Sequence, residues 1–192
     1  MDTFLTIIYG SRQTVFTVRE IALLVGSKDA ANFRSKLSYY VRTGKLIRLR
    51  RGVFAKDERY DPKELAVRIC TPAYIGFETV LAQEGVTFQY YDTIFVASYL
   101  SREISVGKNR IVFRKLRDEL LTDPNGLIDH GFYYEATRER AFLDRLYLSD
   151  SYHFDNLRGI DWGACRKLLP IYRSRKLEIA FETYVNEYAQ QK

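Results

Sequence analysis

The segment from Thr17 to Lys56 constrains the fold more than any other part of the chain, because it carries the pattern helix, turn, helix, hairpin. Gly26 can adopt the left-handed backbone conformation that ends a first short helix. A second helix with apolar residues at helical spacing is expected from about Lys28 to Thr43. Gly44 ends it, and a basic stretch that resembles a hairpin follows. This order of elements predicts a winged helix-turn-helix.

Capping residues mark where the helices should begin. Thr17 is followed three residues later by Glu20, which is the spacing of a capping box. Ser27 is expected to cap the second helix. A further helix is expected in the apolar stretch from Thr3 to Tyr9.

The second helix should have one apolar face and one polar face at about 100° per residue. The face expected to pack inward carries Phe33, Leu37 and Val41, with Ala30 and Tyr40 beside them. Amide, hydroxyl and cationic side chains gather opposite, and such side chains read base edges or contact phosphates. The expected DNA-binding residues of this helix are Lys28, Asn32, Ser35, Lys36, Tyr39 and Arg42. The alternative is an ordinary amphipathic helix with a polar exterior.

The basic stretch after Gly44 predicts a wing. Leu49, Val53 and Ala55 suit strands, and a tight turn is expected between them. The turn would bring Arg48, Arg50 and Arg51 together at its tip. Like charges repel, so an anionic partner such as the DNA backbone or minor groove explains the cluster better than a merely soluble turn.

The distribution of charge sets the first third of the chain apart. Residues 1–60 contain 12 Lys and Arg against 5 Asp and Glu, whereas residues 61–192 contain 18 against 19. The net charge of +6 therefore arises in the first 60 residues. A basic domain attached to a neutral one indicates a polyanion partner for the basic domain alone.

Composition favours a soluble cytoplasmic protein. The chain has no run approaching the ~18–20 apolar residues of a membrane span. Its beginning is short and acidic, unlike a signal peptide. Cys70 and Cys165 are far apart in the sequence and lack metal-like spacing, so we expect two reduced thiols.

Residues 61–192 are expected to form a second, α+β domain after a winged helix-turn-helix domain of residues 1–60. Strand-like runs and a Gly107–Lys108–Asn109 turn predict a small antiparallel sheet, with terminal helices segregated from it. The strands are expected at residues 93–98, 103–106, 110–113, 127–128 and 132–134, and the helices at 64–70, 74–84, 137–148, from 162 and at 174–188.

Residues 61–192 show no pattern of a catalytic or metal-binding site. His130 and His153 are separated by 23 positions and lack ligand spacing. Asp129 and Glu135 lie near predicted strands, but no Lys follows Glu135 at the spacing of a metal nuclease. A phosphate-binding glycine loop is also missing from the sequence. We therefore expect no enzyme, no cofactor and no metal.

Three segments together resemble the AbiEi family of antitoxins and transcriptional regulators. They are TGKLIRLRRGVFA at Thr43–Ala55, TPAYIGFETVLAQEGV at Thr71–Val86 and ATRERAFLDRLYL at Ala136–Leu148. The second is similar to a Tyr-Ile-Ser-Phe/Leu-Glu-Ser-Ala-Leu pattern, and the third to Ala-Thr-Pro-Glu-(Arg/Lys)-Ala-Leu-Leu-Asp-Leu-Leu-Tyr. This chain departs from the family with Gly76 for Ser, Arg138 for Pro and Arg145 for an apolar residue.

The resemblance implies an autorepressor and antitoxin. In this family the N-terminal domain binds inverted repeats upstream of its own operon, and the C-terminal domain counteracts a nucleotidyltransferase-like toxin. In the type IV description of such pairs, no stable complex forms. Two alternatives stay open: a ligand-sensing or general winged-helix transcription factor with no toxin partner, and an enzyme that carries a DNA-targeting domain.

Overall fold

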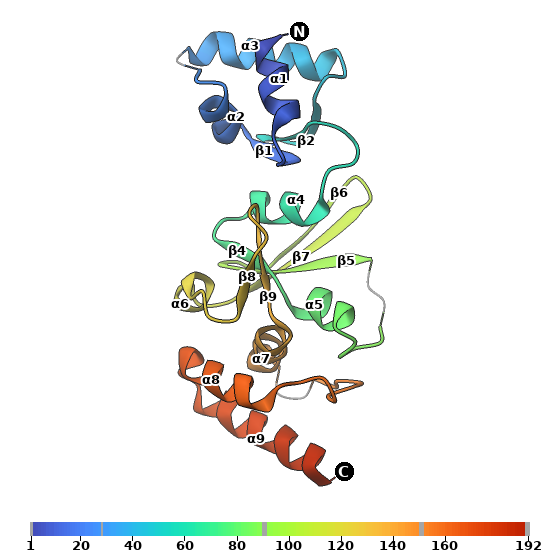
Figure 1. Ribbon diagram of the computed structural model, residues 1–192, viewed down its shortest axis with the longest axis vertical. Helices are drawn as coiled ribbons and strands as arrows, with labels where there is room; N and C mark the ends of the chain where they lie inside the picture. Colours follow the sequence, from blue (N-terminus) through green and yellow to red (C-terminus); the bar gives the residue numbers. More distant parts are fainter. Residues whose placement is uncertain (1, 28, 90–91, 150–151, 191–192) are drawn as a thin grey trace. The chain divides into compact units, whose positions relative to one another are not determined.

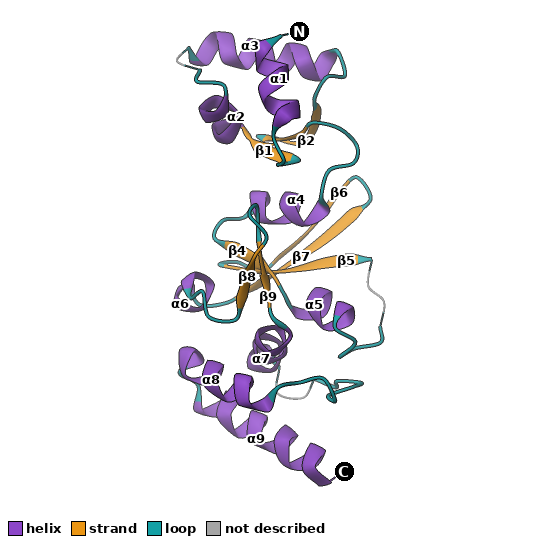
Figure 2. Ribbon diagram, viewed as in Figure 1, coloured by secondary structure: helices purple, strands orange, loops and turns teal. Residues whose placement is uncertain are grey.

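The computed structural model describes residues 2–27, 29–89, 92–149 and 152–190 and is a mixed α+β structure (Figures 1 and 2). The chain forms two compact units. The first comprises Met1–Thr71 with Val106–Lys108, and the second comprises Pro72–Ser105 with Asn109–Lys192. The first unit therefore extends past residue 60, the predicted boundary, and includes one more helix.

Four helices belong to the first unit. They are α1 (Thr3–Gly10), α2 (Val18–Leu24), α3 (Ala30–Arg42) and α4 (Pro62–Ile69). The predicted capping box is present at the start of α2. The Thr17 hydroxyl accepts from the Glu20 amide at 3.2 Å, and the Glu20 carboxylate accepts from the Thr17 amide at 2.7 Å. This reciprocal pair satisfies two amides that the helix itself cannot bond.

The prediction that Ser27 caps α3 is wrong. Asp29 is the capping residue, and its Oδ1 accepts from the amides of Ala31 and Asn32 at 2.9 and 3.1 Å. A carboxylate at this position accepts from two backbone amides, and its negative charge interacts favourably with the positive end of the helix dipole. The helix consequently begins at Ala30.

A three-stranded antiparallel sheet completes the first unit. Its strands are β1 (Val15–Thr17), β2 (Ile47–Arg50) and β3 (Val53–Ala55), in the order β1-β3-β2. Helices and sheet enclose one apolar core, which includes three of the residues predicted to face inward from α3, Phe33, Leu37 and Tyr40, with Val41 packed against it. The side chain of Ala30 lies outside the described residues.

Helix α4 is fixed to this sheet by a buried carboxylate. Asp61 caps α4. Glu64, on its first turn, is buried, and its Oε2 accepts from the Thr14 amide, the Thr14 hydroxyl and the Val15 amide at 2.8 to 3.0 Å. Hydrogen bonds to a charged group are among the stronger ones in proteins. The chain leading into β1 therefore depends on α4.

A six-stranded sheet lies at the centre of the second unit, in the order β6-β7-β5-β4-β9-β8. Its strands are β4 (Ala73–Ile75), β5 (Thr93–Ser98), β6 (Arg102–Val106), β7 (Asn109–Lys115), β8 (Leu127–Asp129) and β9 (Tyr134–Ala136). The pairs β4–β5 and β8–β9 are antiparallel, whereas β5–β7 and β4–β9 are parallel.

The prediction of a small antiparallel sheet is therefore wrong. The turn at Gly107–Lys108 joins β6 to β7 as expected, but the other edge of β7 pairs in parallel with β5. Side-chain alternation identifies each strand, but a parallel partner is reached only through a crossover, so alternation cannot reveal it. The expected helix over residues 74–84 is wrong in its first part, because β4 occupies residues 73–75.

The helices of the second unit stack outward from the sheet. They are α5 (Phe77–Gln83), α6 (Asp118–Thr122), α7 (Arg138–Leu148), α8 (Trp162–Tyr172) and α9 (Arg175–Gln190). Thr137 caps α7 and Asp161 caps α8. Helix α5 contacts β5, α7 contacts α5, and α8 and α9 contact α7 (Figure 2).

Candidate nucleic-acid interface

The outer face of α3 presents polar and aromatic side chains to solvent. Asn32, Ser35 and Arg42 are exposed, and Tyr39 is 46% exposed. The Arg42 guanidinium lies 5.9 Å from the centre of the Tyr39 ring, within the range of a cation–π contact. Lys28, which was predicted to belong to this face, lies outside the described residues. The face therefore offers an amide, a hydroxyl, a phenol and a guanidinium together.

Lys36 lies on the flank of α3 and has an acidic neighbour from its own chain. Its Nζ is 3.2 Å from Oδ1 of Asp2 and 5.2 Å from the centre of the Phe4 ring. Asp2 also accepts hydrogen bonds from the Tyr40 hydroxyl and from the Phe4 amide. These donors, the Tyr40 hydroxyl first, lower the pKa of Asp2, so its carboxylate is ionised at neutral pH. Sequence spacing gave no signal for this contact, because Asp2 is 34 residues from Lys36.

The β2–β3 hairpin carries the three predicted wing arginines. The pairing register shifts between Arg48 and Arg50, and Gly52 closes the turn with a φ of +82°. Arg48 and Arg51 are exposed and Arg50 is half-buried. Within the part of the chain that the structure describes, none of these three side chains has an ion-pair or hydrogen-bonding partner. Their charges are thus available to an external anion.

The hairpin is bonded to the start of α2. The Val18 amide donates to the Gly52 carbonyl at 3.1 Å, and Thr17 pairs with Val53 in the sheet. The tip of the hairpin is therefore anchored by backbone hydrogen bonds.

A hollow of about 580 Å³ borders α3 in the first unit. It lies between the start of α1, the turn after α2 and the first half of α3. Asn32 and Lys36 line it together with Asp2. Two of the predicted DNA-binding residues therefore border a depression that is also lined by two acidic residues, Asp2 and Asp29.

Residues 11–55 match a family model described as a transcriptional regulator, the AbiEi antitoxin. The predicted resemblance is confirmed over these residues. This AbiEi segment contains α2, α3 and the whole three-stranded sheet. The similarity predicted for residues 71–86 and 136–148 lies outside the match and stays a prediction. No curated protein matches the chain.

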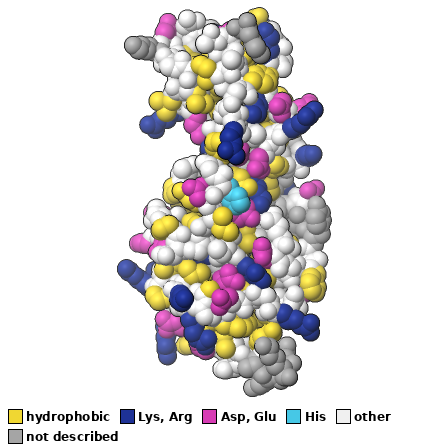
Figure 3. Space-filling model, viewed as in Figure 1, with side chains coloured by type: hydrophobic (Ala, Val, Ile, Leu, Met, Phe, Trp, Pro, Cys, Tyr) yellow, Lys and Arg dark blue, Asp and Glu magenta, His cyan; other side chains and the backbone are white. Residues whose placement is uncertain are grey.

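Beyond the AbiEi segment, charges of both signs are interspersed. On the face drawn in Figure 3, dark blue basic and magenta acidic side chains alternate over the second unit. Two basic residues of its terminal helices are paired locally, Arg166 with Glu182 at 2.9 Å and Arg175 with Glu178 at 3.0 Å. Pairing of this kind weakens the field that either arginine offers to an external anion.

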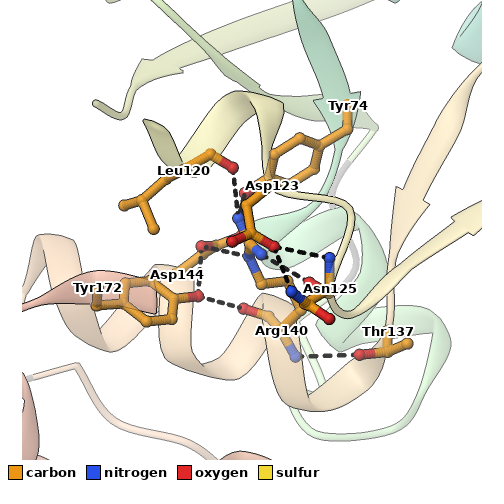
Figure 4. A network of polar contacts seen from close by, with 8 residues as sticks. All are labelled: Tyr74, Leu120, Asp123, Asn125, Thr137, Arg140, Asp144 and Tyr172. Carbon is orange, nitrogen blue, oxygen red and sulfur yellow. Dashed lines mark hydrogen bonds and ion pairs between the residues drawn. The ribbon is translucent and has the colours of Figure 1, made fainter. Parts of the chain in front are cut away.

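The most deeply buried polar cluster centres on Arg140 and Asp144, both 0% exposed (Figure 4). Nε of Arg140 lies 3.2 Å from Asp144, and Tyr74 and Tyr172 donate to the same carboxylate at 2.6 and 2.7 Å. The terminal nitrogens of Arg140 reach two backbone carbonyl oxygens at 2.7 Å. Burial, reinforced by the charge of Asp144, raises the pKa of both tyrosines well above the usual value, so both stay protonated donors. The internal bonds satisfy this cluster, which ties β4, α7 and α8 together.

A second polar cluster, smaller and partly open, joins Glu78 to Arg114 and Arg145. Phe77, just before Glu78, is fully buried and has a φ of +52°, a backbone conformation that bulky residues rarely adopt. This conformation turns the chain from β4 into α5. Neither arginine was singled out as a binding residue from the sequence.

Metal-ligating side chains do not gather in the described ranges, where no group of three or more His, Cys, Asp or Glu could hold an ion. None of the described helices is both long enough and apolar enough to span a membrane.

Proposed function

We propose that this protein is a DNA-binding autorepressor and the antitoxin of a toxin–antitoxin module. Its winged helix-turn-helix would bind inverted repeats upstream of its own operon, and residues beyond it would counteract a nucleotidyltransferase-like toxin. The proposal gives the chain no reaction, cofactor or metal of its own. The AbiEi match carries it, because residues 11–55 also include the exposed face of α3 and the arginine hairpin.

The DNA half is supported by the order of elements in the first unit. Helices α2 and α3 are joined by a short turn, and the β2–β3 hairpin follows. In this arrangement α3 enters the major groove and the hairpin follows the backbone or minor groove. Asn32 suits an adenine edge, Arg42 a guanine edge or a phosphate, and the hairpin arginines suit phosphates.

The antitoxin half rests on the family. Proteins of the AbiEi family pair with a toxin gene, and the proposed partner of this chain is such a toxin, with or without a stable complex. The second unit has its own core and its own sheet, so it is large enough to carry an activity separate from DNA binding.

A gel-shift series on the DNA upstream of the gene tests the DNA half. We expect tight binding that weakens with salt and exceeds binding to a duplex of the same length and shuffled sequence. Equal affinity for both duplexes would overturn the repressor assignment.

Co-expression with the adjacent gene tests the antitoxin half. If that gene product arrests growth, the full chain should restore growth, and a double Arg50→Ala, Arg51→Ala variant expressed from an unrelated promoter should still do so. Operator binding without rescue would refute the antitoxin role and favour a winged-helix regulator with no toxin partner.

A further inference from the structure

We propose that Arg114 and Arg145, on β7 and α7 of the second unit, form a binding site for a phosphate group. The site shares no residue with the proposed DNA interface, so phosphate binding can be tested separately from the proposed function.

One carboxylate oxygen holds both guanidiniums in place. Nη2 of Arg114 lies 2.8 Å from Oε1 of Glu78, and Nε of Arg145 lies 3.0 Å from the same oxygen. Glu78 itself is only 3% exposed. The two cations are therefore held by a single oxygen of a buried side chain.

Aromatic rings pack close to the same guanidiniums. Arg114 lies 4.7 Å from the centre of the Phe95 ring and 5.2 Å from that of Phe77. Arg145 lies 4.0 Å from the centre of the Tyr152 ring. Close packing against a ring reduces the number of rotamers open to each arginine, so less entropy is lost when a ligand binds.

The cluster carries an uncompensated positive charge. Two guanidiniums face one carboxylate, and the side chains of Arg114 and Arg145 are only 23% and 16% exposed. Among the described residues, neither arginine has a second acidic partner. One excess positive charge in a partly buried cluster is unfavourable, and a bound anion would compensate it.

The unused donors of both arginines keep some contact with solvent. Arg114 keeps Nε and Nη1 free, and Arg145 keeps Nη1 and Nη2, while Oε2 of Glu78 is buried without a hydrogen-bond partner. No nitrogen of either arginine is both buried and unbonded among the described atoms. These donors thus reach solvent rather than the vacant internal acceptor, which is the arrangement an external oxyanion needs.

A phosphate suits this geometry better than a single carboxylate. A flat carboxylate pairs best with one guanidinium plane, whereas the oxygens of a tetrahedral oxyanion can accept from two guanidiniums in different planes. The ligand would be free phosphate or the phosphate of a mononucleotide.

The test measures thermal unfolding of the full chain at constant ionic strength, with sodium phosphate, adenosine monophosphate or sodium acetate replacing sodium chloride. The background is the Arg50→Ala, Arg51→Ala variant, so that phosphate binding at the hairpin does not contribute. We expect phosphate to raise the melting temperature of the second unit in a saturable way, by about 3–6 °C at tenfold excess over the dissociation constant.

Matched variants assign the effect to the site. Arg114→Leu and Arg145→Leu each leave Glu78 paired with one guanidinium, so the fold keeps a balanced pair and should lose the phosphate response. Arg145→Lys keeps the positive charge but lacks the two parallel N–H donors of a guanidinium. This variant should need a phosphate concentration more than tenfold higher for half-saturation. Arg166→Gln, at an exposed arginine paired with Glu182, should respond like its background.

Each outcome decides the proposal. A tighter response to adenosine monophosphate than to phosphate supports a nucleotide as the source, and equal responses support free phosphate. No saturable response, an equal response to acetate, or a response that survives in both leucine variants would overturn it.

Discussion

Removing charge from the tip of the hairpin should change how DNA affinity depends on salt. Arg50 and Arg51 flank the turn and have no partner in the described part of the chain, so each can neutralise one phosphate. Each lost phosphate contact lowers the slope of log affinity against log salt by about 0.9, which gives about 1.8 for the double Arg50→Ala, Arg51→Ala variant. A fourfold rise in salt, from about 50 to about 200 mM, then weakens the wild type about tenfold more than the variant.

Fluorescence anisotropy with a labelled duplex at five or six salt concentrations measures both slopes. Specific and shuffled duplexes should show the same change, because phosphates carry no sequence information. Arg175→Ala is the matched control, since this exposed arginine is already paired with Glu178 and lies in the second unit. An unchanged slope in the double variant, or an equal change in the control, would refute the assignment of the hairpin to the DNA backbone.

Three further predictions concern Asn32 on α3, the buried Arg140–Asp144 pair of the second unit and Asp2 of the first unit. Asn32→Ala should reduce discrimination between operator and shuffled DNA by about 1–3 kcal/mol if Asn32 reads a base; equal losses on both duplexes would leave only a backbone contact. Arg140→Met should lower the free energy of unfolding by about 3–5 kcal/mol in urea melts, because Asp144 would stay buried without its cation; an Arg140→Met, Asp144→Leu variant should recover part of the loss, and a loss below about 1 kcal/mol would contradict the argument. Asp2 has a lowered pKa in the folded chain, so its stabilising effect exists above the ordinary value of 3.8 and disappears as the pH falls through the folded value. Between neutral pH and pH 3, the melting temperature of the first unit should therefore fall further in the wild type than in Asp2→Asn. Equal falls would show that Asp2 does not contribute to the pH dependence.

Local signals predicted most of the first unit. The Thr17–Glu20 spacing, the apolar stripe of α3 and the basic stretch after Gly44 each act within a few residues. Helix α2, helix α3 and the hairpin formed close to where the sequence indicated, although α3 begins at Ala30. The capping residue of α3 was missed because Ser27 and Asp29 are both good caps, and only the backbone path decides between them.

Contacts distant in sequence could not be predicted. The parallel pairing of β5 with β7 and the approach of Asp2 to Lys36 depend on the folded path of the chain. The anion site has the same origin, because Glu78, Arg114 and Arg145 come from three separate elements. The predicted DNA-binding residues themselves stay predictions, although Asn32, Ser35, Tyr39 and Arg42 share one exposed face.

The order in which the strands appear along the chain has a consequence for synthesis. The elements α1 to α4 and β1 to β3, which lie entirely within the first unit, have been made once the ribosome passes Ile69. The pairing of β4 with β9 in the second sheet joins Ile75 to Glu135, so it cannot form until about sixty residues after Ile75 have been made. Domains fold largely as units as they emerge, so a nascent chain would pass through a stage with the helices and strands of its first unit complete and its second sheet still open. Under the proposed function, a polypeptide that is released at this stage would keep the proposed DNA-binding part and lack the proposed antitoxin part.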